Sequence, residues 1–125
     1  MKWFKNKPQP QPKPPYLPPT VPEVAEITAL ELKQMLAGEN PPLIVDVRDA
    51  YELAEGVIPG AVHIPMNSVP NCLDELPRDR DLVIHCAVGQ RSWYVAQYLM
   101  RLGYERVRNL EGGIVAWQNL PRYAD

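Results

Sequence analysis

A short segment around one cysteine combines the residue types that nucleophilic sulfur chemistry needs. It reads Cys86-Ala87-Val88-Gly89-Gln90-Arg91-Ser92, and it links an apolar run to a stretch with helical spacing. Its glycine lets the backbone curl, so that successive N–H groups can point at one place, and the positive end of the following helix adds to them. An anion at Cys86 would be stabilised by this arrangement.

The chemistry expected of Cys86 is that of an activated thiol. A free cysteine with a pKa of about 8.5 is only about 3% thiolate at pH 7. A loop that lowers this pKa by about 2 makes the thiolate the major form, a differential interaction of roughly 2.7 kcal/mol. Taken alone, however, a cysteine at a strand end is more often a small buried apolar residue.

The elements that must position this segment alternate between strand and helix. Apolar and β-branched runs predict strands at 43–47, 61–65, 81–86 and 106–110. Helical spacing predicts helices between Thr28 and Gly38, at 91–102 and at 114–119, with a short helix between 49 and 55. Thr28 and Glu31 have the spacing of a capping box, and Gly103 stands where a left-handed cap belongs. Such alternation predicts a parallel sheet covered on both faces, with ligands at the carboxyl ends of its strands.

Four motifs, in this order along the chain, resemble those of the rhodanese-like family, and the likeness covers nearly all of residues 24–119. They are Asp46-Val47-Arg48 with Glu52, Gly56-Val57-Ile58-Pro59-Gly60-Ala61 with His63-Ile64-Pro65, the segment from Cys86 to Ser92, and Leu110-Glu111-Gly112-Gly113-Ile114 with Ala116-Trp117. Each motif is moderately specific alone, and their order makes the resemblance strong. It implies an α/β domain with a five-stranded parallel sheet between helices.

The resemblance also implies a reaction and a set of roles. Cys86 would take a sulfane sulfur from thiosulfate or a persulfide donor, become a persulfide, and pass the sulfur to a thiophilic acceptor. The loop that binds the substrate would comprise Ala87, Val88, Gly89, Gln90, Arg91 and Ser92. Within it, backbone N–H groups would cradle the persulfide, and Arg91 would hold the anionic donor or brace the loop. Asp46 and Arg48 are expected to organise the loop beneath Cys86, and neither a metal nor an organic cofactor is required.

Loop length and loop charge narrow the chemistry. Six residues run from Cys86 to Arg91, whereas phosphatases and arsenate reductases of this family use a loop one residue longer, so sulfur transfer is favoured over phosphate chemistry. The loop has no cation before Arg91, so we expect only a modest electrostatic attraction for the thiosulfate dianion. A persulfide is the alternative donor. The sequence departs from the family pattern at Leu53, Val57 and Trp93. The first two are interpreted as scaffold variations, whereas Trp93 either restricts the donor, presents a docking surface or packs on a neighbour.

Other reactive residues have structural interpretations. His85 is expected to be packed, because neighbouring side chains of a strand point to opposite faces and His85 therefore points away from Cys86. His63 is expected to be a satisfied core histidine, with an approach to the pocket as the alternative. A role for Cys72 in resolving a persulfide or in a disulfide with Cys86 is the less favoured alternative. A disulfide needs Cα atoms about 4.4 to 6.8 Å apart, a distance that the sequence does not give. The remaining polar and aromatic residues of the motifs and turns are interpreted as scaffold or solvated surface, namely Tyr51, Glu52, Trp117 and residues 78–81.

Composition divides the chain at residue 22. Its 125 residues suit a single domain, at 23–125, and eight of its 15 prolines lie in residues 1–22. That basic arm carries four lysines and no acid, and is expected to be an extended or disordered spacer. A ligand for a proline-recognising groove, or a membrane contact through Trp3 and Phe4, is the alternative.

The rest of the chain has a net charge of −6, which argues against nucleic acid as a partner. Two cysteines, no apolar run of about 20 residues and no signal-peptide pattern predict a cytoplasmic protein without a transmembrane segment. The expected partners are a small anionic sulfur donor or a persulfide, with a protein partner for the arm. The alternative function is a non-catalytic rhodanese-like module that is recruited through the Pro-rich arm.

Overall fold

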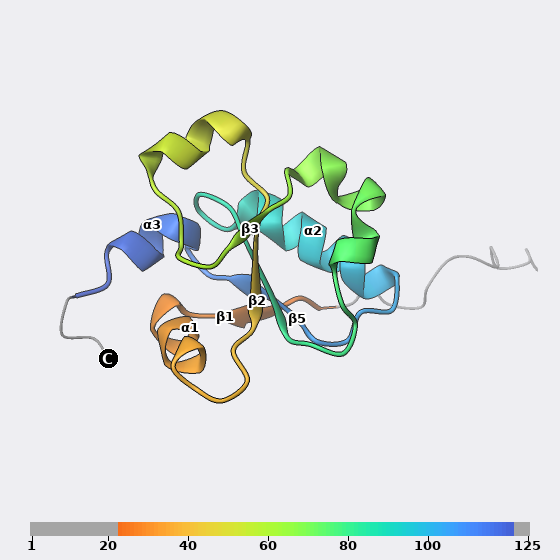
Figure 1. Ribbon diagram of the computed structural model, residues 1–125, viewed down its shortest axis with the longest axis horizontal. Coiled ribbons are helices and arrows are strands. Elements are labelled where there is room, and N and C mark those ends of the chain that lie inside the picture. Colours follow the sequence, from red (N-terminus) through yellow and green to blue (C-terminus); the bar gives the residue numbers. More distant parts are fainter. Residues whose placement is uncertain (1–22, 122–125) are drawn as a thin grey trace, which may run out of the picture.

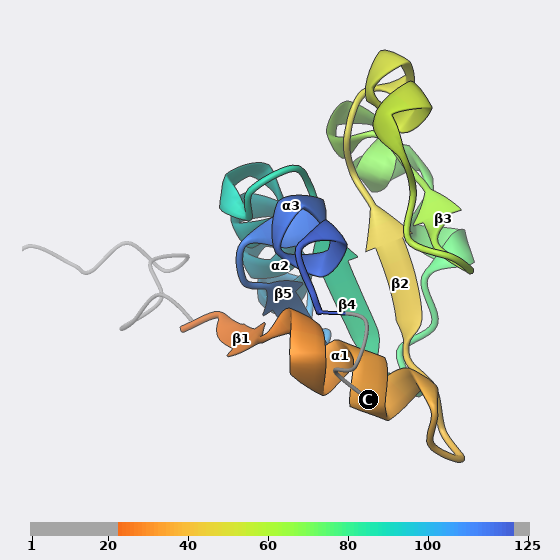
Figure 2. The ribbon, with the colours of Figure 1, turned by 90° about the vertical axis from the view of Figure 1, so that its left-hand side faces the viewer.

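Five parallel strands form one sheet in the computed structural model, which describes residues 23–121. The strands are β1 (Ala25–Ile27), β2 (Leu43–Asp46), β3 (Val62–His63), β4 (Leu82–His85) and β5 (Val107–Leu110). Their order across the sheet is β1-β5-β4-β2-β3, which Figure 2 shows from left to right. The predicted five-stranded parallel sheet is therefore confirmed, and β4 lies at its centre. The Pro-rich arm at residues 1–22 lies outside the described residues.

Helices cover both faces of the sheet, as predicted. They are α1 (Ala29–Leu36), α2 (Gln90–Arg101) and α3 (Gly113–Gln118), with the 3-10 helices η2 (Ala50–Glu55), η3 (Met66–Asn71) and η4 (Leu73–Glu75). In Figure 1, α1 and α3 lie to the left of β2 and α2 lies to its right. Within residues 23–121, no helix is both long enough and apolar enough to cross a bilayer.

The core consists of two layers that the sheet separates. Ile84 of β4 packs with Val95 and Leu99 of α2 on one face. Val83, the preceding residue, packs with Leu32 of α1 and Ile114 of α3 on the other face. Because successive side chains of a strand point to opposite faces, a strand covered on both sides needs consecutive apolar residues. This is why the first three residues of β2 and of β4 are apolar, whereas the polar residues Asp46 and His85 come only at the carboxyl ends of these strands.

Local signals decided the helix boundaries. The Glu31 N–H donates to Thr28 Oγ1 at 3.1 Å and the Thr28 N–H donates to Glu31 Oε1 at 2.9 Å, which confirms the capping box. Gly103 adopts the predicted left-handed conformation with φ +97°. Strand β1 was not predicted from the residue pattern, because only Ile27 of its three residues is buried and the alternation is too short to detect.

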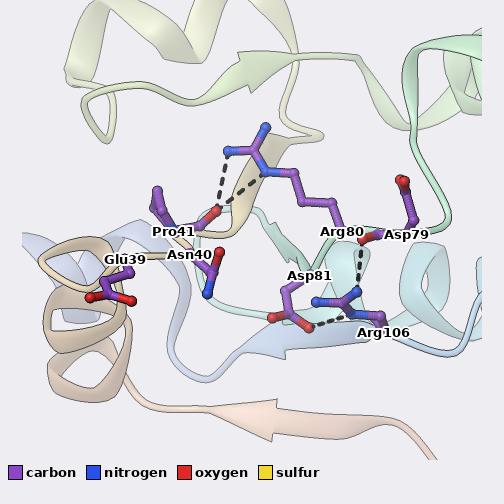
Figure 3. A pocket seen from close by; sticks show the side chains of 7 residues that line it. All are labelled: Glu39, Asn40, Pro41, Asp79, Arg80, Asp81 and Arg106. Carbon is purple, nitrogen blue, oxygen red and sulfur yellow. Dashed lines mark hydrogen bonds and ion pairs between the residues drawn. The ribbon is translucent and has the colours of Figure 1, made fainter.

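The charged residues before the strands tie the amino ends of the sheet together, at the end opposite Cys86. The Arg106 guanidinium donates to Asp81 Oδ1 at 3.1 Å and to the Asp79 carbonyl at 2.7 Å, and Arg80 donates to the Pro41 carbonyl at 3.2 Å (Figure 3). Arg80 and Arg106, the two cations that line the pocket at this end of the sheet, are thus engaged by other groups of the protein. This agrees with the interpretation of residues 78–81 as scaffold.

Candidate active site

Cys86 follows β4 directly and lies at the carboxyl end of the central strand, with only 1% of the residue exposed. Backbone N–H groups donate to its sulfur, among them that of Gly89 at 3.2 Å and that of Ser92 at 3.4 Å. The Ser92 hydroxyl lies 3.3 Å from the same atom. Groups from the loop and from the first turn of α2 therefore converge on the sulfur.

The loop is bent into this shape by hydrogen bonds to the start of α3. The Ile114 N–H donates to the Cys86 carbonyl at 3.0 Å, and the Val115 N–H donates to the Ala87 carbonyl at 3.2 Å. With these carbonyls directed at α3, the N–H groups of the following residues are free to face the sulfur. Gly89 completes the turn at φ +101°, a conformation that glycine adopts without steric cost.

The hydrogen bonds around Cys86 favour its thiolate. Burial alone would raise the pKa of the thiol, but hydrogen bonds from the Ser92 hydroxyl and from backbone N–H groups of Ser92, Gly89 and Val88 outweigh it. The pKa of Cys86 therefore lies below its ordinary value, in the direction that the sequence analysis predicted.

Arg91 is held by a carboxylate rather than left open to the solvent. Its Nη1 and Nη2 donate to the two carboxylate oxygens of Glu52, each at 2.8 Å, and Asp49 lies 3.9 Å away. The hydrogen bond from Arg91 is the main cause that lowers the pKa of Glu52 to about 2. Of the two roles expected for Arg91, this geometry favours bracing the loop. Glu52, interpreted from the sequence as scaffold or surface, lies at the site as the partner of Arg91.

Asp46 and Arg48 form a buried ion pair beneath the segment that carries Glu52. Arg48 Nη2 lies 2.8 Å from Asp46 Oδ2, and the same guanidinium donates to the carbonyls of Glu52 at 3.2 Å and Gly56 at 2.8 Å. Burial would raise the pKa of Asp46, but the hydrogen bonds and the charge of Arg48, together with the nearby His85, outweigh it, so that this pKa is lowered. The pair was expected to organise the loop of Cys86. Its side-chain hydrogen bonds instead organise η2, which acts on that loop through Arg91.

The remaining predicted residues lie at the rim or away from the sulfur. Ala87 is half-buried, whereas Val88 and Gln90 are exposed. Trp93 is half-buried against the core and meets Tyr94 edge to face, with ring centroids 5.1 Å apart. Cys72 and Cys86 are both free thiols. Burial and the neighbouring Glu75 raise the pKa of Cys72, which opposes reactivity there.

The two histidines are in the core or bonded to the backbone. His85 is fully buried with its Nδ1 3.1 Å from the Cys86 carbonyl oxygen, and burial lowers its pKa. His63 places its Nε2 2.7 Å from the Arg48 carbonyl oxygen. Within residues 23–121, no group of three or more His, Cys, Asp or Glu side chains is arranged to hold a metal ion.

Sequence analysis missed Asn109, whose side chain is buried beside Ser92 and Gly89. A signal was available, because Val107 and Leu110 mark β5 as a core strand and a polar residue on its inner face needs partners. Which partners it has depends on the elements beside β5, and these are not visible in the local sequence.

Comparison with known proteins agrees with the fold. The chain matches the model of the rhodanese-like domain over residues 28–120 and therefore belongs to the rhodanese-like domain family. It is 48% identical over 94 residues to a protein named sulfurtransferase from Allochromatium vinosum, covering 75% of this chain and 88% of that protein. It is 40% identical over 96 residues to the putative sulfurtransferase YtwF of Bacillus subtilis, covering 77% and 92%. A crystal structure of a rhodanese-like domain protein from Staphylococcus aureus superposes with a TM-score of 0.71 at 41% identity, covering 75% and 91%.

Replacement of Gly113 by alanine tests the contact between the loop and α3. A Cβ at Gly113 would lie 2.6 Å from the Cys86 carbonyl oxygen and still closer to Ala87, so that we expect a loss of about 3 kcal/mol or more in the free energy of unfolding. Gly60→Ala is the matched control, because Gly60 also has a positive φ but no atom within 4 Å of the added Cβ. It should lose only about 1–2 kcal/mol. Equal losses for the two variants in urea denaturation would contradict the contact.

The Glu52–Arg91 pair predicts a pH dependence of stability. Because the pKa of Glu52 falls from 4.5 to about 2 on folding, the pair stabilises the protein fully above pH 4.5 and progressively less as the pH falls towards 2. Glu52→Gln removes this titration. Urea denaturation between pH 7 and pH 3 should show the advantage of the wild type over this variant shrinking below pH 4.5, and parallel curves would refute the pairing.

Proposed function

We propose that the protein is a rhodanese-type sulfurtransferase in which Cys86 carries sulfane sulfur as a persulfide. The convergence of hydrogen-bond donors on the buried Cys86 sulfur is the observation that supports this best, because a purely structural cysteine needs no such donors. The names of the relatives from Allochromatium vinosum and Bacillus subtilis support the same class of reaction.

The reaction comprises two sulfur transfers, each the attack of a nucleophile on a sulfane sulfur. The Cys86 thiolate attacks the outer sulfur of the donor, a new S–S bond forms, and the S–S bond within the donor breaks. The leaving group takes both electrons of that bond. It is sulfite when thiosulfate is the donor and a thiolate when a persulfide is the donor. In the second step a thiophilic acceptor attacks the outer sulfur of the Cys86 persulfide, and the Cys86 thiolate leaves. The groups that stabilise this thiolate therefore favour its formation before the first step and its departure in the second.

A persulfide is the donor that the charges around the loop favour. Thiosulfate is a dianion and needs an available cation, but both terminal nitrogens of Arg91 are engaged by Glu52, and no loop residue before Arg91 is basic. The exposed side chains next to the loop include Val88 of the loop itself and Tyr94 of α2, which are largely apolar. Such surroundings suit a donor with little charge, such as a thiol persulfide, better than a small dianion.

Intact mass after brief incubation with a donor tests the proposed function. Wild-type protein under non-reducing conditions should gain one sulfur atom from a thiol persulfide, and less of it from thiosulfate at equal concentration. Cyanide or a thiol should remove this sulfur. Cys86→Ser should gain none, whereas Cys72→Ser, which removes the other free thiol, should load like the wild type. If neither donor modifies the wild type, the alternative of a non-catalytic binding module is favoured.

Aryl phosphates should not be hydrolysed, because the loop from Cys86 to Arg91 has only six residues and Arg91 is already bound to Glu52. A chromogenic aryl phosphate assay at neutral pH checks this. Turnover that disappears in Cys86→Ser would contradict the assignment to sulfur transfer.

A further inference from the structure

Asn109 contacts both of the residues whose groups surround the Cys86 sulfur. Its Nδ2 donates to the Gly89 carbonyl at 3.0 Å, and its Oδ1 accepts a hydrogen bond from the Ser92 hydroxyl at 2.6 Å. Gly89 and Ser92 supply the N–H groups that donate to the sulfur. Asn109 itself is 2% exposed and lies on β5, the strand beside β4.

The orientation of the Asn109 amide is set by two acceptors, the Glu26 carboxylate on the edge strand β1 and the Gly89 carbonyl. The Glu26 carboxylate oxygens lie 3.1 and 3.3 Å from Asn109 Nδ2, and the Gly89 carbonyl oxygen lies on the same nitrogen. Both neighbours accept hydrogen bonds and donate none, so that the amide nitrogen must face them. The amide oxygen is thereby directed at Ser92.

This orientation has a consequence for the single proton of the Ser92 hydroxyl. A serine hydroxyl donates one hydrogen bond and accepts up to two. Two acceptors lie within reach of it, Asn109 Oδ1 at 2.6 Å and Cys86 Sγ at 3.3 Å. While the proton points to Asn109, the Ser92 oxygen can only accept from the sulfur, which suits the neutral thiol. To stabilise the thiolate, the hydroxyl must turn away from Asn109.

We propose that Asn109 is a positioning residue that competes with the Cys86 sulfur for the Ser92 hydroxyl proton, with Glu26 holding its amide in the competing orientation. This inference rests on the proposed function. In the thiol and persulfide states, where Cys86 Sγ carries no charge, the proton stays on the Asn109 side. When Sγ becomes a thiolate, before attack or on departure, the hydroxyl turns to it. The competition keeps the thiolate from being over-stabilised, and a less stabilised thiolate is the stronger nucleophile.

The other charged and titratable groups around Cys86 affect its thiol without contacting the Ser92 hydroxyl. Arg91 on α2 lies close enough to interact electrostatically with Cys86 and is paired with Glu52 of η2. His85 on β4 contacts the Cys86 carbonyl rather than its sulfur. Glu26 on β1 reaches the site only through Asn109. None of these groups touches the Ser92 hydroxyl, so a test that depends on Ser92 isolates the competition.

The test is the thiolate ultraviolet absorbance of the full chain as a function of pH, measured as a difference from the matching Cys86→Ser protein. Asn109→Leu keeps the branched shape but cannot accept the proton, so the pKa of Cys86 should fall by about 0.5–1. Asn109→Asp keeps the acceptor and adds a charge, so this pKa should rise. A merely structural role would disturb the loop in both variants and raise the pKa in both.

A second background identifies the proton in question. In Ser92→Ala protein, Asn109→Leu should leave the pKa of Cys86 unchanged. Arg108→Ala is the matched control on the same strand, because its side chain is exposed and it should shift nothing. An unchanged or raised pKa in Asn109→Leu, or a fall that persists in Ser92→Ala, would overturn the proposal.

Glu26→Lys supplies a variant on an exposed residue that does not disturb the core, in case Asn109→Leu fails to fold. A lysine ammonium removes one of the two acceptors that face the amide nitrogen and attracts the amide oxygen. The amide therefore turns in a fraction of the molecules, and in these the Ser92 proton is released to the sulfur. The pKa of Cys86 should fall further with Ser92 present than in Ser92→Ala, where only the added positive charge acts. Equal falls in the two backgrounds would refute the role of Glu26. No sulfur donor is used, so these results are independent of whether the protein transfers sulfur.

Discussion

The geometry around Cys86 depends on where two backbone carbonyls find their hydrogen-bond donors. The carbonyls of Cys86 and Ala87 accept from the N–H groups of Ile114 and Val115, at the start of α3. A buried carbonyl without a donor is costly, and the first N–H groups of a helix have no partners within the helix, so the two needs satisfy each other. The loop can then aim its own N–H groups at the sulfur. Gly113 allows this close approach because it has no side chain.

The position of β4 at the centre of the sheet gives the sulfur different neighbours on its two sides. On one side, β5 contributes Asn109, which contacts Ser92, and β1 contributes Glu26, which accepts a hydrogen bond from the Asn109 amide. On the other side, β2 leads into η2, which contributes Glu52 as the partner of Arg91. The proposed control of the Ser92 hydroxyl proton therefore lies on one side of the loop, and the pairing of the Arg91 charge lies on the other. Parallel strands make this arrangement natural, because their carboxyl ends meet at the same edge.

The cations near the site are each paired with a carboxylate, so that little positive charge is available to an anionic ligand. Arg48 is almost fully buried, bonds to Asp46, and fixes the backbone of Glu52 and Gly56. Glu52, held in this way, engages both terminal nitrogens of Arg91. A bidentate carboxylate is a strong competitor for an incoming anion. This physical constraint underlies the preference proposed for a donor of low charge.

What the sequence alone determined about this protein is local or follows from the order of its motifs. The capping box of Thr28 and Glu31, the buried strands and the turn at Gly103 depend on near neighbours in the chain, and the motif order indicated the family. The tertiary structure alone decided that Arg91 binds Glu52, 39 residues away, and that Asn109 meets Glu26, 83 residues away. Side chains so far apart meet only through the strand order, and no local pattern encodes it. For the same reason Asp46 and Arg48, recognised as important from their motif, hold η2 rather than the cysteine loop.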